Sequence, residues 1–283
     1  MDTINRSPTL LVKKAESSWL NKIWRITATG FCFAFFGIGG LILSALWFPL
    51  LRLCIKNELK CHAMTQNSIK NTFRFFIKLM QTLGILDIHF IHLEKLDEDS
   101  GCIMVANHPS LLDYVFLASV MPRCDCIVKE TLLDNFFMSG VIKAAGYIPN
   151  TQADILLPAC QKKLNESGTI LIFPEGTRTT PGQSIQLQRG AANIALRSKV
   201  DIRIARIHCD LPMLTKQGKW YNIPPAKPTF TISIDEKIHI HDFISDGDEA
   251  LAADARRLTQ YLQQKLSEHN LLISKESDND ITQ

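Results

Sequence analysis

The sequence predicts an α/β fold: a largely parallel or mixed sheet flanked by helices, preceded by a hydrophobic membrane helix or re-entrant helix pair. From residue 88 onward, short apolar strand-like runs alternate with helix-like segments, which favours a sheet covered on both faces. Polar residues follow two of the buried runs, where open α/β sheets place their ligands. Residues 26–51 contain no charged residue and are long enough to cross a bilayer with some tilt.

The composition limits the classes of protein and partner. The chain has 283 residues, of which 46% are apolar and 21% charged, as in an ordinary globular protein. A net charge of +3 is too small to indicate nucleic acid as a partner but suits weak attraction to an anionic membrane surface. The eight cysteines include no C-x-x-C pair, so we predict no structural metal site and a reducing, cytosolic environment for the catalytic part.

The apolar run 26–51 leaves its topology open. It lies between Arg25 and Arg52, and basic residues are nearly balanced on its two sides, so the positive-inside rule does not orient it. Three glycines within 37–40 together with Pro49 are able to break it into a re-entrant pair with both ends cytosolic, and a buried core helix is the remaining alternative. We expect attachment to the inner or plasma membrane, with the active site on the cytoplasmic face.

A second helix is predicted at 68–86, where apolar residues recur at helical spacing with Lys70, Arg74 and Lys78 between them. Two interpretations fit this pattern: a basic amphipathic helix in the headgroup layer, or a core-packing helix with a solvated basic face. With the apolar run, this helix completes a predicted membrane-association segment over residues 1–86.

The later elements follow from apolar runs and the residues that interrupt them. Strands are predicted at 88–93, 102–106, 126–128, 169–173, 202–208 and 230–234. Helices are predicted at 111–120, 136–145, 154–166, 191–198 and 248–266. Because no Gly-Pro linker and no repeat interrupts them, we predict one catalytic domain over 87–270, followed by a disordered polar tail over 271–283.

The first chemically capable stretch is Asn107-His-Pro-Ser-Leu-Leu-Asp113. Pro109 disfavours the α conformation at His108, so His108 lies in a turn, with Ser110 as the N-cap of the following helix and Asp113 at its third position. From that turn the imidazole can fold back to the Asp113 carboxylate, which forms a base and its orienting partner. No G-x-S-x-G elbow supports Ser110 as a nucleophile, so we favour direct attack by an acceptor hydroxyl.

The second stretch, Phe173-Pro-Glu-Gly-Thr-Arg178, follows another buried strand and brings a carboxylate and a guanidinium to the same edge. Residues 107–113 resemble the N-H-x-x-x-x-D motif of the glycerolipid (lysophospholipid) acyltransferase family, which is 1-acyl-sn-glycerol-3-phosphate acyltransferase-like. Residues 173–178 resemble the F-P-E-G-T-R motif of the same family. The resemblance extends over roughly residues 25–215.

The resemblance implies roles for these residues. His108 is the general base that activates the acceptor hydroxyl toward an acyl thioester, and Asp113 orients it. The substrate-binding residues that it implies are Glu175, Gly176, Thr177, Arg178 and Lys129. It implies that Arg178 pairs with a phosphate and that Gly176 lies by the thioester oxyanion. The alternative interpretation is that Glu175 and Arg178 only form a salt bridge with each other. No bound cofactor is implied. Acyl-CoA or acyl-carrier protein is the co-substrate and membrane lipids are partners, while the oligomeric state stays open.

One departure from the family concerns the acceptor. In many glycerophosphate-acylating members a Gly-x-Ile turn continues as Ile-x-Arg, whereas this chain has Asn150 after Ile148-Pro149. The fourth block of the family is also poorly matched. The 1-acylglycerol-3-phosphate reaction leads, with a non-glycerophosphate or polyketide-like acceptor as the alternative. Candidates to replace the lost charge are Arg189, Arg203 and Arg206. A lipid esterase or thioesterase and a non-catalytic lipid-binding scaffold are the competing functions.

Overall fold

A seven-stranded sheet organises the structure. The computed structural model describes residues 19–180, 183–245 and 250–279, except the side chains of 136–138 and 269–279. The strands are β1 (Asp87–Ile91), β2 (Ile103–Ala106), β3 (Asp125–Lys129), β4 (Ile148–Asn150), β5 (Ile170–Ile172), β6 (Ile202–Cys209) and β7 (Thr229–Ile238). They lie in the order β1-β7-β6-β2-β5-β3-β4. All neighbours are parallel except β6 and β7, which confirms the predicted mixed α/β sheet.

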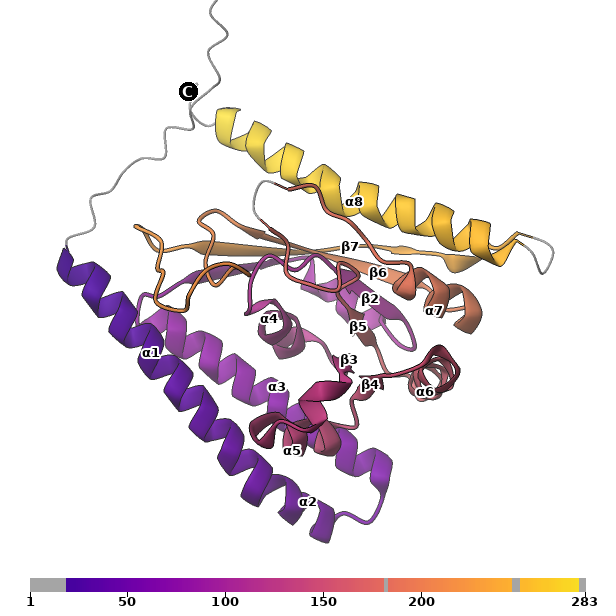
Figure 1. Ribbon diagram of the computed structural model, residues 1–283, viewed down its shortest axis with the longest axis horizontal. Coiled ribbons are helices and arrows are strands. Elements are labelled where there is room, and N and C mark those ends of the chain that lie inside the picture. The colour runs from indigo at the N-terminus through magenta and orange to yellow at the C-terminus, as the bar shows by residue number, and fades with distance from the viewer. Residues whose placement is uncertain (1–18, 181–182, 246–249, 280–283) are drawn as a thin grey trace, which may run out of the picture.

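Helices cover both faces of this sheet (Figure 1). The helices after β1 are α4 (Asp113–Val120), α5 (Phe136–Ala145), α6 (Ala153–Asn165), α7 (Gly190–Ser198) and α8 (Leu251–Asn279), with short 3₁₀ turns at Leu93–Glu98, Glu130–Leu133 and Ile240–Phe243. One core cluster joins α6, α7 and α8 to one face, and another joins α3 and α4 to the other. The central strand β2 is fully buried, as its continuous apolar sequence predicts for a parallel strand.

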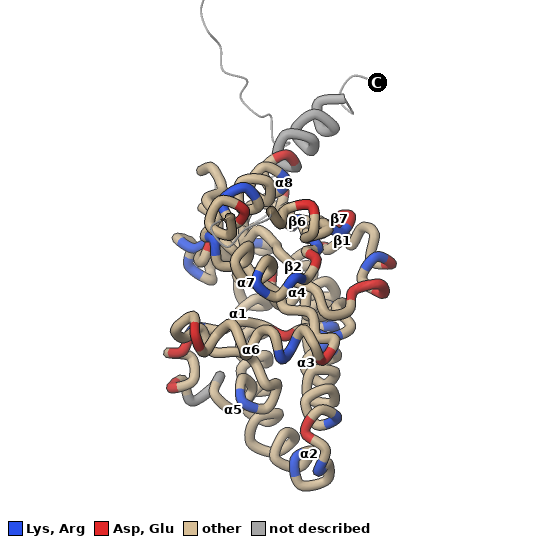
Figure 2. The backbone as a smooth tube through the Cα atoms, turned by 90° about the vertical axis from the view of Figure 1, so that its right-hand side faces the viewer, with Lys and Arg blue, Asp and Glu red and all other residues tan. Residues whose placement is uncertain are grey.

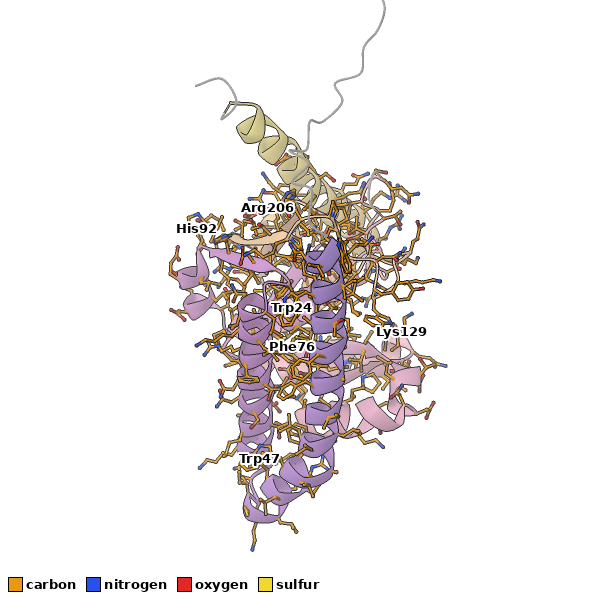
Figure 3. The ribbon with its side chains drawn as sticks, turned by 90° about the vertical axis from the view of Figure 1, so that its left-hand side faces the viewer. Trp24, Trp47, Phe76, His92, Lys129 and Arg206 are labelled. Atoms are coloured by element: carbon orange, nitrogen blue, oxygen red, sulfur yellow. The ribbon has the colours of Figure 1, made fainter. Side chains whose placement is uncertain are left out.

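The apolar run forms one bent helix and is not broken at its glycines. Helix α1 (Trp19–Ile42) contains all three of them and continues through a π-helical turn (Leu43–Trp47) into α2 (Phe48–Cys54). The bend therefore falls at the π-helical turn, next to Pro49, where backbone hydrogen bonds are already irregular. Among the described residues, this helix alone is long and apolar enough to cross a membrane. Its hairpin partner is α3 (Glu58–Thr82), which returns alongside it (Figure 3).

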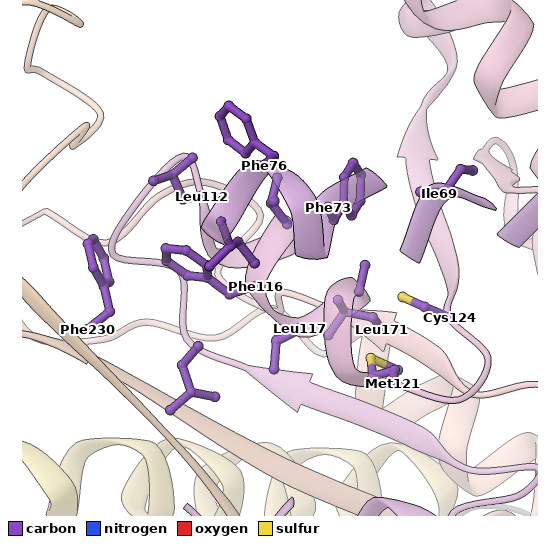
Figure 4. Close-up of a cluster of buried hydrophobic side chains, with 14 of the residues drawn as sticks. Ile69, Phe73, Phe76, Leu112, Phe116, Leu117, Met121, Cys124, Leu171 and Phe230 are labelled. Carbon is purple, nitrogen blue, oxygen red and sulfur yellow. The ribbon is translucent and has the colours of Figure 1, made fainter. Parts of the chain in front are cut away.

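Helix α3 is a core helix, which decides between the two interpretations of this segment. It begins ten residues earlier than predicted, where Asn57 Oδ1 accepts a hydrogen bond from Lys60 N at 2.9 Å. Phe73 and Phe76 are buried members of the core cluster in Figure 4. The Phe73 ring lies 5.8 Å from that of Tyr114 in α4, and the Phe76 ring lies 4.8 Å from that of Phe36 in α1. A position in the headgroup layer for this apolar face is therefore wrong, because protein covers it.

The basic face of α3 is also used inside the protein. Lys70 Nζ donates to Val120 O at 3.1 Å, and Arg74 Nε donates to Ser119 O at 2.8 Å. These carbonyls end α4 and have no partner within that helix, so the two cations satisfy them and complement the helix dipole. Since α3 packs on the sheet, the predicted domain boundary between residues 86 and 87 does not separate two hydrophobic cores.

Two element predictions need correction at their edges. Strand β4 was not predicted, because it has only three residues and contains Pro149, which fits an edge strand. Helix α8 runs to Asn279 and thus continues beyond the predicted end at 266. The predicted tail over 271–283 falls on residues whose side chains, and beyond 279 whose backbone, lie outside the described set.

Gly168 is required by a close approach at the beginning of β5. A Cβ atom there would lie 2.4 Å from Asp125 Oδ2 and 2.9 Å from Lys163 O. Asp125 is fully buried and is held by Gln66 Nε2 at 2.9 Å. We expect Gly168→Ala to lower the free energy of unfolding by about 3 kcal/mol through overpacking. Chemical denaturation measures this, with Gly190→Ala as the matched control because its Cβ meets nothing within 4 Å; equal stability of the two variants would contradict it.

Candidate active site

The two polar stretches meet at one edge of the sheet. Strands β2 and β5 are parallel neighbours with Val105 paired to Ile172, so the residues that follow them emerge side by side. Thr179 N donates to His108 O at 2.7 Å, which ties the two segments directly. The topology therefore brings together the two motifs that the sequence placed at strand ends.

His108 and Asp113 form the predicted pair. His108 Nδ1 lies 2.8 Å from Asp113 Oδ2, and the Asp113 side chain is fully buried. Its imidazole stacks on the ring of Phe173, with centroids 4.2 Å apart and an interplanar angle of 22°. Because an ionised carboxylate accepts from Nδ1–H, the neutral imidazole keeps Nε2 as its basic atom. With 21% of its side chain exposed, His108 can reach a substrate.

The prediction of Ser110 as the N-cap is wrong: α4 begins at Asp113, its N-cap is Leu112, and no side chain caps it, so Ser110 lies in the turn before the helix. Ser110 Oγ accepts from Leu112 N at 3.3 Å, and Ser110 N donates to Asp113 Oδ2 at 2.7 Å. These two hydrogen bonds close a turn over residues 110–113, after which regular helix begins. Ser110 is 1% exposed, which argues against its use as a nucleophile.

Asn107 has a structural role that the sequence did not reveal. Its Nδ2 donates to Ile207 O at 2.7 Å, and its Oδ1 accepts from Ile207 N at 2.8 Å. An amide side chain in this position continues the ladder between β2 and β6 past the last residue of β2. The sequence feature that could have indicated this role is the position of a polar residue directly after a buried strand.

Glu175 connects the two motifs and does not pair with Arg178. Its Oε1 accepts from His108 N at 2.9 Å and from Thr179 Oγ1 at 2.7 Å. The interpretation of Glu175 and Arg178 as a mutual salt bridge is therefore wrong. The carboxylate fixes the backbone of the base, and its contacts are within the protein, so Glu175 positions His108.

Arg178 is anchored on one edge of its guanidinium. Nη1 donates to Leu214 O at 2.9 Å and to Thr215 O at 3.0 Å, in the segment between β6 and β7. Within the described residues, Nε and Nη2 make no hydrogen bond. This leaves donors for an anionic group on a side chain whose direction is already set.

Gly176 adopts φ +67°, a conformation that glycine takes at no steric cost, and both Gly176 and Thr177 are exposed. Gly176 N donates to Phe173 O at 3.1 Å and closes a turn. The implied oxyanion contact therefore cannot use this N–H while the turn is formed. A Cβ at Gly176 would come no closer than 3.9 Å to its nearest neighbour, so the backbone conformation, not a tight contact, demands glycine.

Lys129 ends β3 at the same edge of the sheet and is exposed. In the register of β3 and β4, its Cα partner is Asn150, the position where many family members carry arginine. The missing arginine would thus lie beside Lys129. The structure places a single cation where two are expected.

Two of the three candidate replacements for this charge are engaged elsewhere. Arg203 is 1% exposed and holds the Asp99 carboxylate through Nε at 3.0 Å and Nη2 at 2.7 Å. Arg206 pairs with Asp235 near His92, on the other side of the molecule from Lys129 (Figure 3). Arg189 is exposed at the beginning of α7, next to Gln188, whose N–H donates to Pro174 O at 2.7 Å. Only Arg189 remains close to the second motif.

A cavity of about 200 Å³ lies beside the first motif. It is lined in part by Asn107, Ser110, Thr179, His208 and Cys209. Within the described ranges, no three His, Cys, Asp or Glu side chains gather as metal ligands would.

Burial raises the pKa of Asp113 to about 6, against a lowering influence from His108 and the Ser110 N–H. In the unfolded chain the pKa of this carboxyl is 3.8, so the folded protein binds the proton more tightly. The stabilisation that this proton gives to the folded state is therefore lost as pH rises through about 6. Only the ionised carboxylate stabilises an imidazolium. We therefore expect kcat/KM to fall as pH falls through about 6. A pH–rate profile without a limb in this region would contradict the assignment.

Comparison with known proteins agrees with this geometry. A family model described as Acyltransferase matches residues 87–208. A 1-acyl-sn-glycerol-3-phosphate acyltransferase of Helicobacter pylori is 34% identical over 122 residues, which cover 40% of this chain and 52% of that protein. The human 1-acyl-sn-glycerol-3-phosphate acyltransferase beta is 30% identical over 115 residues, covering 38% and 41%. The chain thus spans about half the length of these curated relatives.

A solved structure shares the fold. The 1-acyl-sn-glycerophosphate acyltransferase PlsC of Thermotoga maritima has a TM-score of 0.61 at 18% identity, covering 87% of this chain and 97% of that one. At this identity the likeness concerns the fold, including the mixed sheet and the N-terminal helices. Residues 87–208 thus match the Acyltransferase family model, and over this part the chain is similar to curated 1-acyl-sn-glycerol-3-phosphate acyltransferases.

Proposed function

We propose that this protein is a membrane-associated O-acyltransferase that moves a fatty acyl group from an acyl thioester to a lysophospholipid hydroxyl. The leading reaction converts 1-acylglycerol-3-phosphate to phosphatidate. The observation that carries the proposal is the His108 and Asp113 pair, 2.8 Å apart, at the place where both motifs meet; no described residue forms a hydrogen bond with His108 Nε2. The donor is acyl-CoA or acyl-carrier protein, and both motifs of the resemblance support this thioester class.

The chain's own residues supply the proton transfers of such a reaction. His108 Nε2 takes the proton of the acceptor hydroxyl while its oxygen attacks the thioester carbonyl. A C–O bond forms, the C–S bond breaks, and the imidazolium returns the proton to the leaving thiolate. The Asp113 carboxylate stabilises the imidazolium through Nδ1–H, and Glu175 fixes the His108 backbone. The deep burial of Asp113 strengthens this interaction because water does not compete for it.

Membrane attachment follows from the surface of the N-terminal helix. Exposed apolar side chains recur along it at intervals of three or four residues, with one interval of seven after Trp24: Leu20, Trp24, Phe31, Phe35, Ile38, Ile42, Leu46, Leu50 and Leu53. Such a stripe on one face is typical of a helix that lies in a membrane interface. A patch of this size on a protein surface marks an interaction site.

The hairpin geometry favours attachment to one leaflet over spanning. Trp24 Nε1 donates to Leu83 O at 3.1 Å, so the beginning of α1 and the end of α3 lie at the same end of the hairpin. Basic residues gather at the opposite tip, where α2 ends (Figure 2). Charges at the tip are costly in the hydrocarbon centre, and α3 is committed to the catalytic core. We propose the cytoplasmic face for the active site, in keeping with the reducing environment that the cysteine pattern predicts.

The experiment that tests the function offers purified full-length protein a labelled acyl-CoA or acyl-carrier protein. Acceptors are 1-acylglycerol-3-phosphate, other lysophospholipids and non-glycerol lipids, with products identified by mass. We expect phosphatidate as the main product. Thiol release without any acceptor would indicate an esterase or thioesterase instead, and no turnover with any pair would indicate a binding scaffold.

The Asn150 position tests how the acceptor phosphate is bound. Asn150→Arg places a guanidinium beside Lys129 at the catalytic edge of the sheet. A charge-assisted contact to phosphate is worth up to about tenfold in affinity, so we expect a severalfold lower KM for 1-acylglycerol-3-phosphate. Steady-state kinetics measure this, with Asn165→Arg at the end of α6 as the matched control. An equal KM in both variants would favour an acceptor whose phosphate does not reach this edge, or which has none.

A further inference from the structure

We propose that the loop between β6 and β7, residues 210–228, is a second membrane contact that binds an anionic lipid surface. Its contact patch consists of Lys216, Lys219, Trp220 and Tyr221, and the same loop holds Arg178 in position. Only the consequence for Arg178 rests on the proposed function. The lipid contact itself follows from the surface of the loop.

The loop is joined to the beginning of the membrane helix. The Trp220 ring lies against Gly30 of α1, where a Cβ would meet two ring atoms at 3.2 Å. Arg25, 3% exposed, donates from Nη1 to Pro224 O at 3.0 Å and thereby fixes the loop's far side to α1. The patch is therefore continuous with the exposed apolar stripe of that helix.

The chemistry of the patch matches the headgroup region of a bilayer. Trp220 and Tyr221 are 48% and 43% exposed, unusual for side chains of their size. Tryptophan and tyrosine favour the membrane–water interface, because an apolar ring carries a polar atom. Lys219 Nζ lies 5.6 Å from the centre of the Tyr221 ring. The patch thus presents cations and aromatic rings on one short segment.

The loop is mainly basic. Residues 210–228 contain three lysines and one acidic residue, Asp210, whose Oδ1 accepts from Thr229 N at the base of the loop. Lys227 pairs with Asp87, whereas Lys216 and Lys219 are exposed and form no ion pair within the described residues. Lysines at a membrane surface are attracted by anionic headgroups. An acidic carrier protein has the same charge, but continuity with the apolar stripe of α1 favours the lipid surface.

The loop also reaches the active site through one strained residue. Leu214 has φ +53° and is 4% exposed, an uncommon conformation for a branched side chain. Its carbonyl accepts from Arg178 Nη1 at 2.9 Å and from Leu111 N at 3.1 Å. Leu111 lies between His108 and Asp113 in the sequence. A displacement of the loop therefore moves both the guanidinium and the catalytic turn.

The first experiment locates Trp220 directly. The chain has four tryptophans, and the Trp19→Phe, Trp24→Phe, Trp47→Phe variant keeps only Trp220. The protein is mixed with vesicles of phosphatidylcholine and phosphatidylglycerol whose acyl chains carry bromine atoms. Flotation of the vesicles then shows whether the protein is bound. We expect strong quenching of Trp220 fluorescence. Bound protein with unquenched Trp220, absence of binding, or quenching only by added brominated acyl-carrier protein would each overturn the proposal.

The second experiment tests the charge. Lys216→Gln with Lys219→Gln removes two cations from the patch, and we expect about 30-fold weaker binding to the anionic vesicles. The matched control, Lys162→Gln with Lys199→Gln, removes two exposed cations from α6 and from the residue after α7, away from α1 (Figure 1). Equal losses of affinity in the two double variants would overturn the role of the patch.

The third experiment concerns Arg178. An acceptor with a short acyl chain, soluble as a monomer, is supplied with or without acceptor-free anionic vesicles. We expect the vesicles to lower the acceptor KM of the wild type and to leave that of the Lys216→Gln, Lys219→Gln variant unchanged. An identical response of both proteins would overturn the coupling. A protein without any transferase activity would refute the proposed function, while the quenching and binding results would still decide the lipid contact.

Discussion

Replacement of His108 by alanine is expected to lower kcat by about 100-fold or more, because it removes the atom that takes the hydroxyl proton. The rest of the site should persist. Glu175 contacts the backbone N–H of residue 108 and not its side chain, and Thr179 contacts its carbonyl, so the turn retains both anchors. Initial rates with saturating acyl thioester and acceptor measure the effect.

His89→Ala is the matched control for this variant. His89 lies on the edge strand β1 and is exposed, so the same substitution there is expected to leave the rate within a factor of two of the wild type. Circular dichroism and vesicle flotation should be unchanged in both proteins. A His108→Ala enzyme that keeps near-wild-type activity would refute the general-base assignment.

Asp113→Asn is expected to reduce kcat by a comparable factor, on the order of 10² to 10⁴, as for an aspartate that orients a catalytic imidazole. Asp113 Oδ2 accepts from both His108 Nδ1 and Ser110 N. In the variant, a carboxamide oxygen at the Oδ2 position can keep both contacts, but it carries no charge to stabilise the imidazolium. In the flipped orientation the NH₂ group faces Nδ1 instead. A donor at Nδ1 places the ring proton on Nε2, which then cannot accept a proton from the substrate.

The same substitution separates catalysis from folding. At neutral pH the buried Asp113 carboxylate costs stability, about 3 kcal/mol for a pKa raised from 3.8 to about 6, and its Oδ1 has no hydrogen-bond partner. We therefore expect the free energy of unfolding of Asp113→Asn at neutral pH to be no lower than that of the wild type. Loss of activity together with clear destabilisation would mean that Asp113 mainly supports the fold.

Local sequence signals predicted the parts of the site that lie on one segment. Pro109 indicated the turn at His108, and the short distance along the chain from His108 to Asp113 allowed their contact. Ser110 lies in this turn and not at the N-cap, because α4 begins only at Asp113. Apolar runs located six of the seven strands, since buried parallel strands have continuous apolar sequences. The three-residue β4 escaped because its length and its proline carry no strand signal.

Contacts between distant segments were beyond such signals. Glu175 reaches the His108 backbone only because β5 is inserted next to β2, and the order of strands is a property of the whole sheet. The same holds for Lys70 and Arg74, whose spacing predicted a solvated face but whose partners are the last carbonyls of α4. The glycines of α1 suggested a break, yet apolar helices tolerate glycine.

The shared core of α3 and the sheet decides how a detergent-free form of this enzyme can be made. Deletion of residues 1–86 would remove the α3 part of a core cluster that also contains α4, including the contact of Phe73 with Tyr114, and we expect such a fragment to aggregate. The lipid-facing stripe of α1 is instead separable by substitution, because its outward side chains leave the core untouched. Water solubility should therefore be engineered by polar replacements along one helix face and not by a cut in the chain.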